Sequence, residues 1–350
     1  MLTRFIDKFI QRVAFVIMLC MVMAACSDSD DDAVGTEDVS VAFTLTVADA
    51  TSTRADNDGW DDYSPAQDGI LNENMVNTDD IIIAIYDDKG NKVDNVEDLR
   101  VTTVSDPSIT GATVYAITGV WRNAKPNVDK AKRVMVIANS NVSAWGDPSA
   151  LTYDLNPGTR KYIPMWGVVK IPATLTLGKQ NKLHNIQMLR AMAKVSVSLR
   201  TDMTKSGYAI GSMTVNNYNT KGYCVPKTFN EVDNTSEVRF ANSLNVLDSH
   251  ADKIALPTTA PLYLPEYDNS GTNPTTITVN LNRNGTLEGS YTLEFRNYDS
   301  DGKPTGSTYP IQRNHYYQYW IYKEKGKMIV TLHVRKWNRR IYPETDGIIM

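Results

Sequence analysis

Hydrophobic and polar residues alternate along much of the chain, and the alternation is clearest over Val39–Val47. Ser, Thr and Ala occupy one set of alternate positions there. The other set is apolar throughout and consists of Val39, Val41, Phe43, Leu45 and Val47. Successive side chains of a strand point to opposite sides, so a period of two over nine residues is typical of a strand with one buried face. We therefore predict a half-buried strand over Val39–Val47.

Further β-rich segments recur along the chain, and clusters of Asp, Asn and Gly that favour turns separate them. After residue 26 no segment combines helical periodicity with adequate length and end signals. The pattern predicts an all-β protein of sandwiches or barrels with few short helices. The predicted strands are 81–86, 113–121, 133–138, 192–199, 275–281, 290–295, 316–322 and 328–337.

The chain has 350 residues, of which 42% are hydrophobic. This length is enough for about two domains, each with its own core. A polar stretch at 178–184 separates two strand-rich halves, which predicts an N-terminal β-sandwich over 39–180 and a C-terminal one over 181–350. Residues 48–79 form a long polar connection after the first strand, and we expect it to be an exposed, cleavable loop.

The first residues are typical of a secretory signal, because three basic side chains precede an uncharged apolar run over 13–23. This run is too short to cross a bilayer as a helix. Ala24 and Ala25 then precede Cys26, as a lipoprotein signal peptidase requires. We expect residues 1–25 to be a lipoprotein signal peptide cleaved between Ala25 and Cys26, with lipid attached to Cys26; an ordinary secretory signal is the alternative.

Residues 26–38 contain a run of Ser and Asp that cannot bury apolar surface. We interpret them as an acidic tether. The run also resembles the export signal that directs Bacteroidetes lipoproteins to the outer face of the outer membrane, and a simple spacer is the alternative.

Charge and cysteine content exclude several classes of function. The chain has 36 Lys and Arg against 40 Asp and Glu, a net charge of -4, so it lacks the basic excess of a nucleic-acid-binding protein. With 3 Cys and no Cys/His cluster, a disulfide scaffold or a structural zinc site is not expected. We interpret Cys224 as a small buried apolar residue.

No pattern of catalytic residues is present. There is no nucleophile elbow and no phosphate-binding loop, and the segment 297–302 resembles a calcium loop but lacks its final Glu, so we predict a hairpin turn there. The histidines are not spaced as metal ligands. We expect no enzyme activity, no catalytic residues, no cofactor and no metal site. The four histidines are His184, His250, His315 and His333.

The aromatic run over 315–322 has two interpretations. Alternation places Tyr317, Tyr319 and Ile321 on one strand face. The other face carries Tyr316, Gln318, Trp320 and Tyr322. A core strand between two covered faces would have this composition, and it is the interpretation that we favour. An exposed platform on which sugars stack is the alternative, and it would make the chain a glycan-binding surface lipoprotein.

Several motifs together resemble the fimbrillin and fimbrial anchor superfamily of Bacteroidetes, in an order that spans nearly the whole chain. Each motif is weak by itself. They are the lipobox at Cys26, the strand over Val39–Val47, the loop Thr53-Arg54-Ala55, and the segments 72–74, 81–90, 163–167, 189–195, 313–317 and 334–337.

The resemblance implies two tandem transthyretin-like β-sandwich domains and assembly into type V pili. In that scheme a trypsin-like protease cuts after an Arg, the first strand leaves, and a strand of a neighbouring subunit fills the groove. Here it implies that Val39–Val47 is the removable strand and that cleavage falls between Arg54 and Ala55. Residues 342–350 would be the donor strand, although Pro343 and Gly347 interrupt it.

We therefore expect a surface-exposed lipoprotein of the outer membrane that acts as a fimbrial subunit or fimbrial anchor and supports adhesion. Its expected partners are other fimbrial subunits through strand addition, the outer membrane through lipid on Cys26, and host or bacterial surface ligands. An envelope hydrolase would require a convergent pair of carboxylates.

Overall fold

The structure is a computed structural model that describes residues 36–47, 71–105, 113–141, 150–155, 162–171, 174–227, 229–231, 238–240, 244–256, 258 and 261–336. Across these ranges the fold is nearly all β, as predicted, and the α-helix in them is the single turn α2 (Thr201–Lys205). Two short 3-10 helices, η2 (Leu71–Asn74) and η3 (Val128–Lys130), accompany it. Cys26, Arg54, Ala55 and residues 342–350 lie outside the described part of the chain.

The first core is enclosed by one nine-stranded sheet with the order β3-β2-β6-β8-β10-β1-β5-β4, and β9 pairs with β1. The strands β3 and β4 lie at opposite ends of this order, yet Val96 alone separates them in sequence. The sheet must therefore curl back on itself around its core. Its strands are β1 (Val39–Val47), β2 (Ile81–Tyr86), β3 (Lys92–Asn95), β4 (Glu97–Ser105), β5 (Thr113–Trp121), β6 (Arg133–Ala138), β8 (Met165–Lys170), β9 (Gln180–Lys182) and β10 (Ile186–Arg190).

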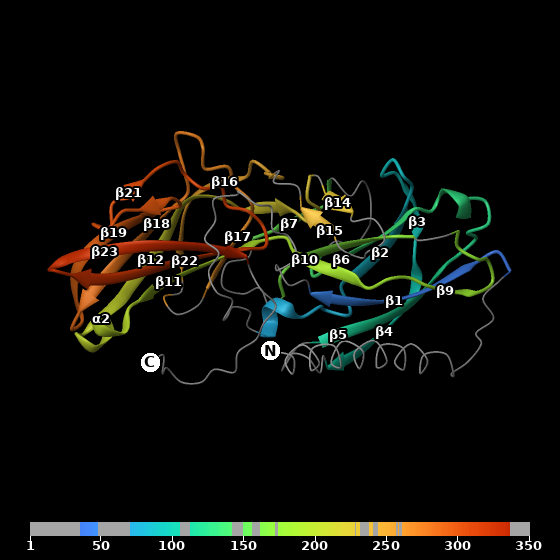
Figure 1. The fold of residues 1–350 in the computed structure, drawn as a ribbon, viewed down its shortest axis with the longest axis horizontal. Helices are drawn as coiled ribbons and strands as arrows, with labels where there is room; N and C mark the ends of the chain where they lie inside the picture. Colours follow the sequence, from blue (N-terminus) through green and yellow to red (C-terminus); the bar gives the residue numbers. More distant parts are fainter. Residues whose placement is uncertain are drawn as a thin grey trace, which may run out of the picture.

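The second core lies between two four-stranded sheets with the orders β17-β11-β22-β23 and β16-β12-β18-β19. Figure 1 shows this sandwich in yellow to red at one end of the molecule and the first core in blue to green at the other. The strands are β11 (Ala193–Leu199), β12 (Tyr208–Asn219), β16 (His250–Leu256), β17 (Leu262–Leu264), β18 (Thr276–Arg283), β19 (Thr286–Glu294), β22 (His315–Glu324) and β23 (Lys327–Lys336).

Three two-stranded ladders complete the described fold. The pair of β7 (Thr152–Asp154) with β13 (Lys221–Tyr223) joins the halves, because β13 follows the second sandwich's strand β12 in the chain. Directly after β13, Cys224 is fully buried in the first core, as predicted. The other two pairs are β14 (Phe229–Glu231) with β15 (Val238–Phe240) and β20 (Asn297–Tyr298) with β21 (Pro304–Thr305).

The β20–β21 pair is the hairpin predicted at 297–302. Asp299 Oδ1 accepts hydrogen bonds of 2.9 Å from the backbone N–H groups of Asp301 and Lys303. An aspartate that binds its own turn in this way is a common device of tight turns. This carboxylate thus stabilises the hairpin.

The two cores divide at the end of β10. Met192 belongs to the first core and Ala193 to the second. Both β9 and β10 belong to the first sheet, so residues 181–192 pack with the first half of the chain. We therefore propose a domain boundary between Met192 and Ala193 instead of between residues 180 and 181.

Candidate functional site

The strand β1 lies in the interior of the first sheet and is paired along both of its edges. It is antiparallel to β5, and the paired residues run from Val39 opposite Trp121 to Leu45 opposite Tyr115. Along its other edge it is parallel to β9 and then to β10. A strand in this position satisfies backbone hydrogen-bonding groups on both neighbours, and those groups become unpaired if it leaves.

Both faces of β1 are buried. The apolar face, from Val39 to Val47, is at most 3% exposed, as the alternation predicts. The prediction of a half-buried strand is wrong for the other face, whose residues are at most 9% exposed. Asn185 supplies polar partners on that face, because its side chain bonds the hydroxyl groups of Thr44 and Thr46.

Burial of β1 contributes a large share of the first core. Full burial of a Val, Leu or Phe side chain stabilises a protein by about 1.5–3 kcal/mol, so the five apolar residues of β1 contribute on the order of 10 kcal/mol. Whole domains are stable by about 5–15 kcal/mol. Without β1 the fold would therefore need another strand in the space between β5 and the β9–β10 edge.

Ion pairs hold the beginning of β1. Asp38 Oδ2 accepts a hydrogen bond of 2.8 Å from Arg122, and Asp38 Oδ1 accepts one of 2.9 Å from the backbone N–H of Asn123. One residue earlier, Glu37 pairs with Lys125 at 2.8 Å. The Asp98 carboxylate, and after it the Asp38 carboxylate, raise the pKa of the Arg122 guanidinium above its usual value, and the Glu37 carboxylate raises the pKa of the Lys125 ammonium. These contacts must break before β1 can leave.

Residues 48–70 connect β1 to η2. After them, Glu73 lies at the junction of the two cores and is 1% exposed. Its carboxylate pairs with Lys194 of β11 at 2.9 Å and accepts a hydrogen bond of 2.6 Å from the Tyr263 hydroxyl of β17. Burial, and secondarily the Glu73 carboxylate, raise the pKa of Tyr263 far above its usual value. Arg190, at the end of β10, donates to the Glu73 carbonyl at 3.0 Å and also bonds the Asn74 side chain.

Hydrogen bonds also hold residues 75–77. Asn139 donates to the carbonyl of Met75 at 2.9 Å and accepts from the backbone N–H of Asn77 at 2.7 Å. The N–H of Val76 donates to the Tyr115 hydroxyl at 2.9 Å. We call residues 73–77 the anchored segment. Because β1 lies on one side of the 48–70 connection and the anchored segment on the other, a cut within it would free β1 from the chain that follows.

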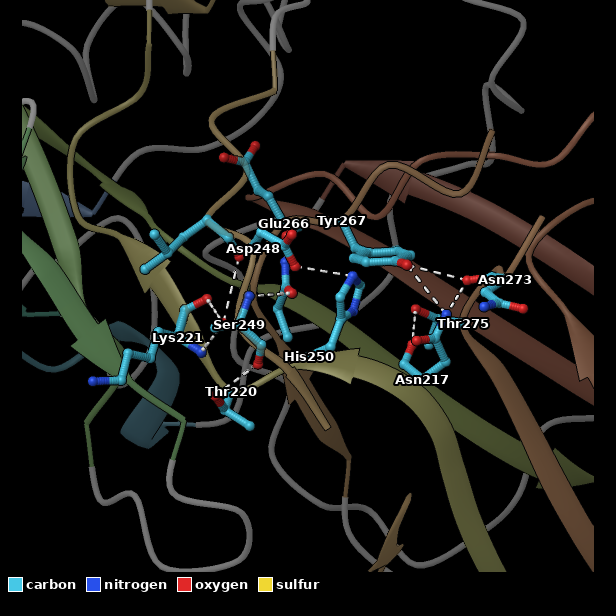
Figure 2. A network of polar contacts seen from close by, with 12 residues as sticks. Asn217, Thr220, Lys221, Asp248, Ser249, His250, Glu266, Tyr267, Asn273 and Thr275 are labelled. Carbon is cyan, nitrogen blue, oxygen red and sulfur yellow. Dashed lines mark hydrogen bonds and ion pairs between the residues drawn. The ribbon is translucent and has the colours of Figure 1, made fainter. Parts of the chain in front are cut away.

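A second polar network organises the neighbouring part of the second sandwich (Figure 2). The Thr220 N–H and hydroxyl both donate to the Ser249 carbonyl, at 3.0 and 2.9 Å. Nearby, His250 pairs with Asp248 at 3.0 Å and lies edge-on to Tyr267, with ring centres 5.2 Å apart. These contacts connect β12, β16 and the chain after β17. We interpret the network as structural.

One face of the aromatic run is core. Tyr317, Tyr319 and Ile321 are fully buried in the second core, so they cannot form a sugar platform. On the other face Tyr316 is 6% exposed. Tyr322 on that face is stacked by the Arg200 guanidinium, 4.2 Å from the ring centre. The prediction of a core strand is correct for the first face.

Within the described ranges, no three His, Cys, Asp or Glu side chains are grouped as a metal ion would require. The same ranges contain no helix with the length and apolar character needed to traverse a membrane.

Neither family models nor curated proteins match the chain. Among solved structures it is similar to a fimbrial assembly protein of Parabacteroides distasonis, at 14% identity and a TM-score of 0.47, over 85% of this chain and 98% of that one. It is also similar to the tip fimbrial protein Mfa3 of Porphyromonas gingivalis, at 15% identity and a TM-score of 0.46, over 86% and 100%.

Proposed function

We propose that this chain is a non-enzymatic fimbrial subunit that assembles by strand exchange at the position of β1. The observation that carries the proposal is the place of β1, an interior strand with two buried faces and paired edges. Its connection to the rest of the domain is the segment 48–70, which includes Arg54. Such a strand leaves a specific groove when it is removed, and a strand from another subunit fits it by main-chain hydrogen bonds and alternate side chains.

In this proposal cleavage between Arg54 and Ala55 separates β1 from the anchored segment. The strand is then held by non-covalent contacts alone, and a donor strand replaces it. The anchored segment stays in place because its hydrogen bonds and ion pair come from residues outside β1. They are made by Arg190, Lys194, Tyr263, Tyr115 and Asn139. The first sheet thereby keeps its shape while its strand is exchanged.

We further propose that the chain reaches the cell surface as a lipoprotein, with cleavage between Ala25 and Cys26 and lipid on Cys26. The apolar run before Cys26 and the acidic residues after it support this part of the proposal. Retention of lipid would make the chain an anchor subunit, and cleavage at Arg54 would release it into the polymer.

Substitution of Arg54 tests the proposal in cells that make surface polymers. The Arg54→Ala chain should keep its N-terminal segment and should be absent from the polymer, as judged by the mass of the surface-associated protein. Arg283→Ala is the matched control, because Arg283 is an exposed arginine beside a tight hairpin turn. Normal maturation and normal incorporation of the Arg54→Ala chain would contradict the proposed cleavage.

A further inference from the structure

The partner of β1 on its parallel edge contains a bulge. Ala42 pairs with Lys182 and Leu45 pairs with Ile186, so two residues of β1 face the three residues 183–185. The strands β9 and β10 are thus one interrupted strand with an extra residue at the interruption. Bulges of this kind redirect a side chain and often lie beside functional sites.

The side chain of Asn185 in this bulge contacts two residues of β1. Its Oδ1 accepts a hydrogen bond of 2.9 Å from the Thr44 hydroxyl, and its Nδ2 donates one of 2.9 Å to the Thr46 hydroxyl. Thr44 is 2% exposed and Thr46 is 9% exposed. One amide therefore bonds two of the three hydroxyl groups on the face of β1 opposite the apolar row.

We infer that Asn185 is a specificity-determining residue for the strand that occupies this site. The inference rests on the proposed function and adds the chemistry of the partner. The partner is a strand of another subunit with apolar residues where β1 has Val39, Val41, Phe43, Leu45 and Val47. It carries Ser or Thr at the two positions that Thr44 and Thr46 hold.

Asn185 discriminates between donor strands because its side chain needs both a hydrogen-bond donor and an acceptor from the strand. A hydroxyl group both donates and accepts, so two of them satisfy the carbonyl and the amino group of Asn185. Apolar residues at these positions would leave both polar atoms without these partners in a site that a strand covers, which is unfavourable. The other contacts along this edge, from Asn181 to the Ser40 carbonyl and from the Leu183 N–H to the Ala42 carbonyl, involve the backbone of β1 and accept any sequence.

Residues 342–350 do not meet these requirements. Pro343 lacks an N–H for the ladder, Gly347 has no side chain to fill a pocket, and Ile348, Ile349 and Met350 are consecutive instead of alternating. The sequence of this segment thus favours a donor strand of different sequence, from another kind of subunit, over residues 342–350 of a second copy.

A displacement experiment on the full chain tests the inference. A specific protease site is introduced near Arg54, the chain is cut, and labelled peptides compete with β1 for its place. One peptide has the sequence of residues 37–49, and a second carries Thr44→Val and Thr46→Val. The hydroxyl peptide should displace β1 at about tenfold lower concentration than the valine peptide.

The same comparison in an Asn185→Leu chain should abolish this preference. His184→Ala is the matched control, because His184 is exposed in the same bulge, and it should leave the preference unchanged. If the Asn185→Leu chain does not fold, the two peptides on the unsubstituted chain still decide the question.

Two results of the displacement experiment would contradict different parts of the account. Equal displacement by the hydroxyl and valine peptides on the unsubstituted chain would overturn the role of Asn185 and leave strand exchange standing. No displacement by either peptide, even in large excess over the cut chain, would overturn the proposed function itself.

Discussion

Arg190 Nε donates a hydrogen bond of 3.0 Å to the backbone carbonyl of Glu73. Arg190 ends β10, the strand beside β1, whereas Glu73 follows the connection that includes Arg54. The same guanidinium bonds Asn314, which immediately precedes β22 of the second sandwich, at 3.1 Å. One fully buried side chain therefore links the edge of the strand-exchange site, the anchored segment and the second domain.

Glu73→Gln should destabilise the protein by about 3 kcal/mol, because it leaves the buried Lys194 ammonium without its counter-charge. Chemical denaturation measures the change in the free energy of unfolding. Glu97→Gln, on an exposed position of the edge strand β4, is the matched control and should change stability by less than about 0.5 kcal/mol. Equal effects of the two substitutions would show that the pair does not hold the junction.

Phe43→Ala should cost about 3–5 kcal/mol in the uncut chain, because Phe43 is 0% exposed at the centre of β1 and its loss leaves a cavity. Ser40→Ala on the opposite face of the same strand removes little volume and should cost about 1 kcal/mol or less. After cleavage of the 48–70 connection, the Phe43→Ala strand should also dissociate faster. A dissociation rate equal to that of the unsubstituted strand would argue against β1 as a core strand.

Asp38→Ala should weaken the beginning of β1 by about 1 kcal/mol, since it removes a charged acceptor from the backbone N–H of Asn123 and from Arg122. Asp98→Ala provides the comparison: Asp98 bonds the same guanidinium, but its side chain is 59% exposed. We expect a smaller effect there. Hydrogen exchange of the β1 amides would distinguish them, and greater exchange in the Asp98→Ala chain would contradict the account.

The stability of the second sandwich should decrease as the pH rises above about 10. Burial raises the pKa of Tyr298 to about 12, and it also raises the pKa values of Tyr317 and Tyr319. Below the unfolded value of about 10 both states are protonated, so stability does not change. Between about 10 and 12 the unfolded chain loses the Tyr298 proton first, so unfolding becomes more favourable.

Absorbance at 295 nm measures the ionisation of the tyrosines, and denaturation at several pH values measures the free energy of unfolding. Tyr298→Phe should reduce the decrease in stability between pH 10 and 12. Ionisation of all tyrosines near pH 10 in the folded protein would contradict the burial of this group.

Alternation of side chains made several strands predictable. The predicted segments Val39–Val47, Ile81–Tyr86, Thr113–Trp121 and Arg133–Ala138 coincide with β1, β2, β5 and β6. The pattern of apolar residues did not predict the long strands β4 and β12. The strand β4 is an edge strand with charged residues, and β12 contains an irregular pairing between Ile210 and Ser212, so neither shows a clean apolar period.

The polar contacts of the site could not be predicted from the sequence. The segments that include Glu73 and Arg190 were noted as family landmarks, but their contact joins residues 117 positions apart and depends on how the two cores meet. The role of Asn185 depends on a one-residue bulge between β9 and β10, which no local pattern specifies. The burial of the Ser and Thr face of β1 was missed for the same reason, since Asn185 bonds the hydroxyl groups of Thr44 and Thr46 on that face.

The mass of this chain in purified surface polymers tests the central claim most directly. Strand exchange at β1 predicts polymer-borne chains that begin at Ala55 and lack residues 39–47. Polymer-borne chains that all retain residues 39–47, or absence of the chain from the polymer, would contradict the account.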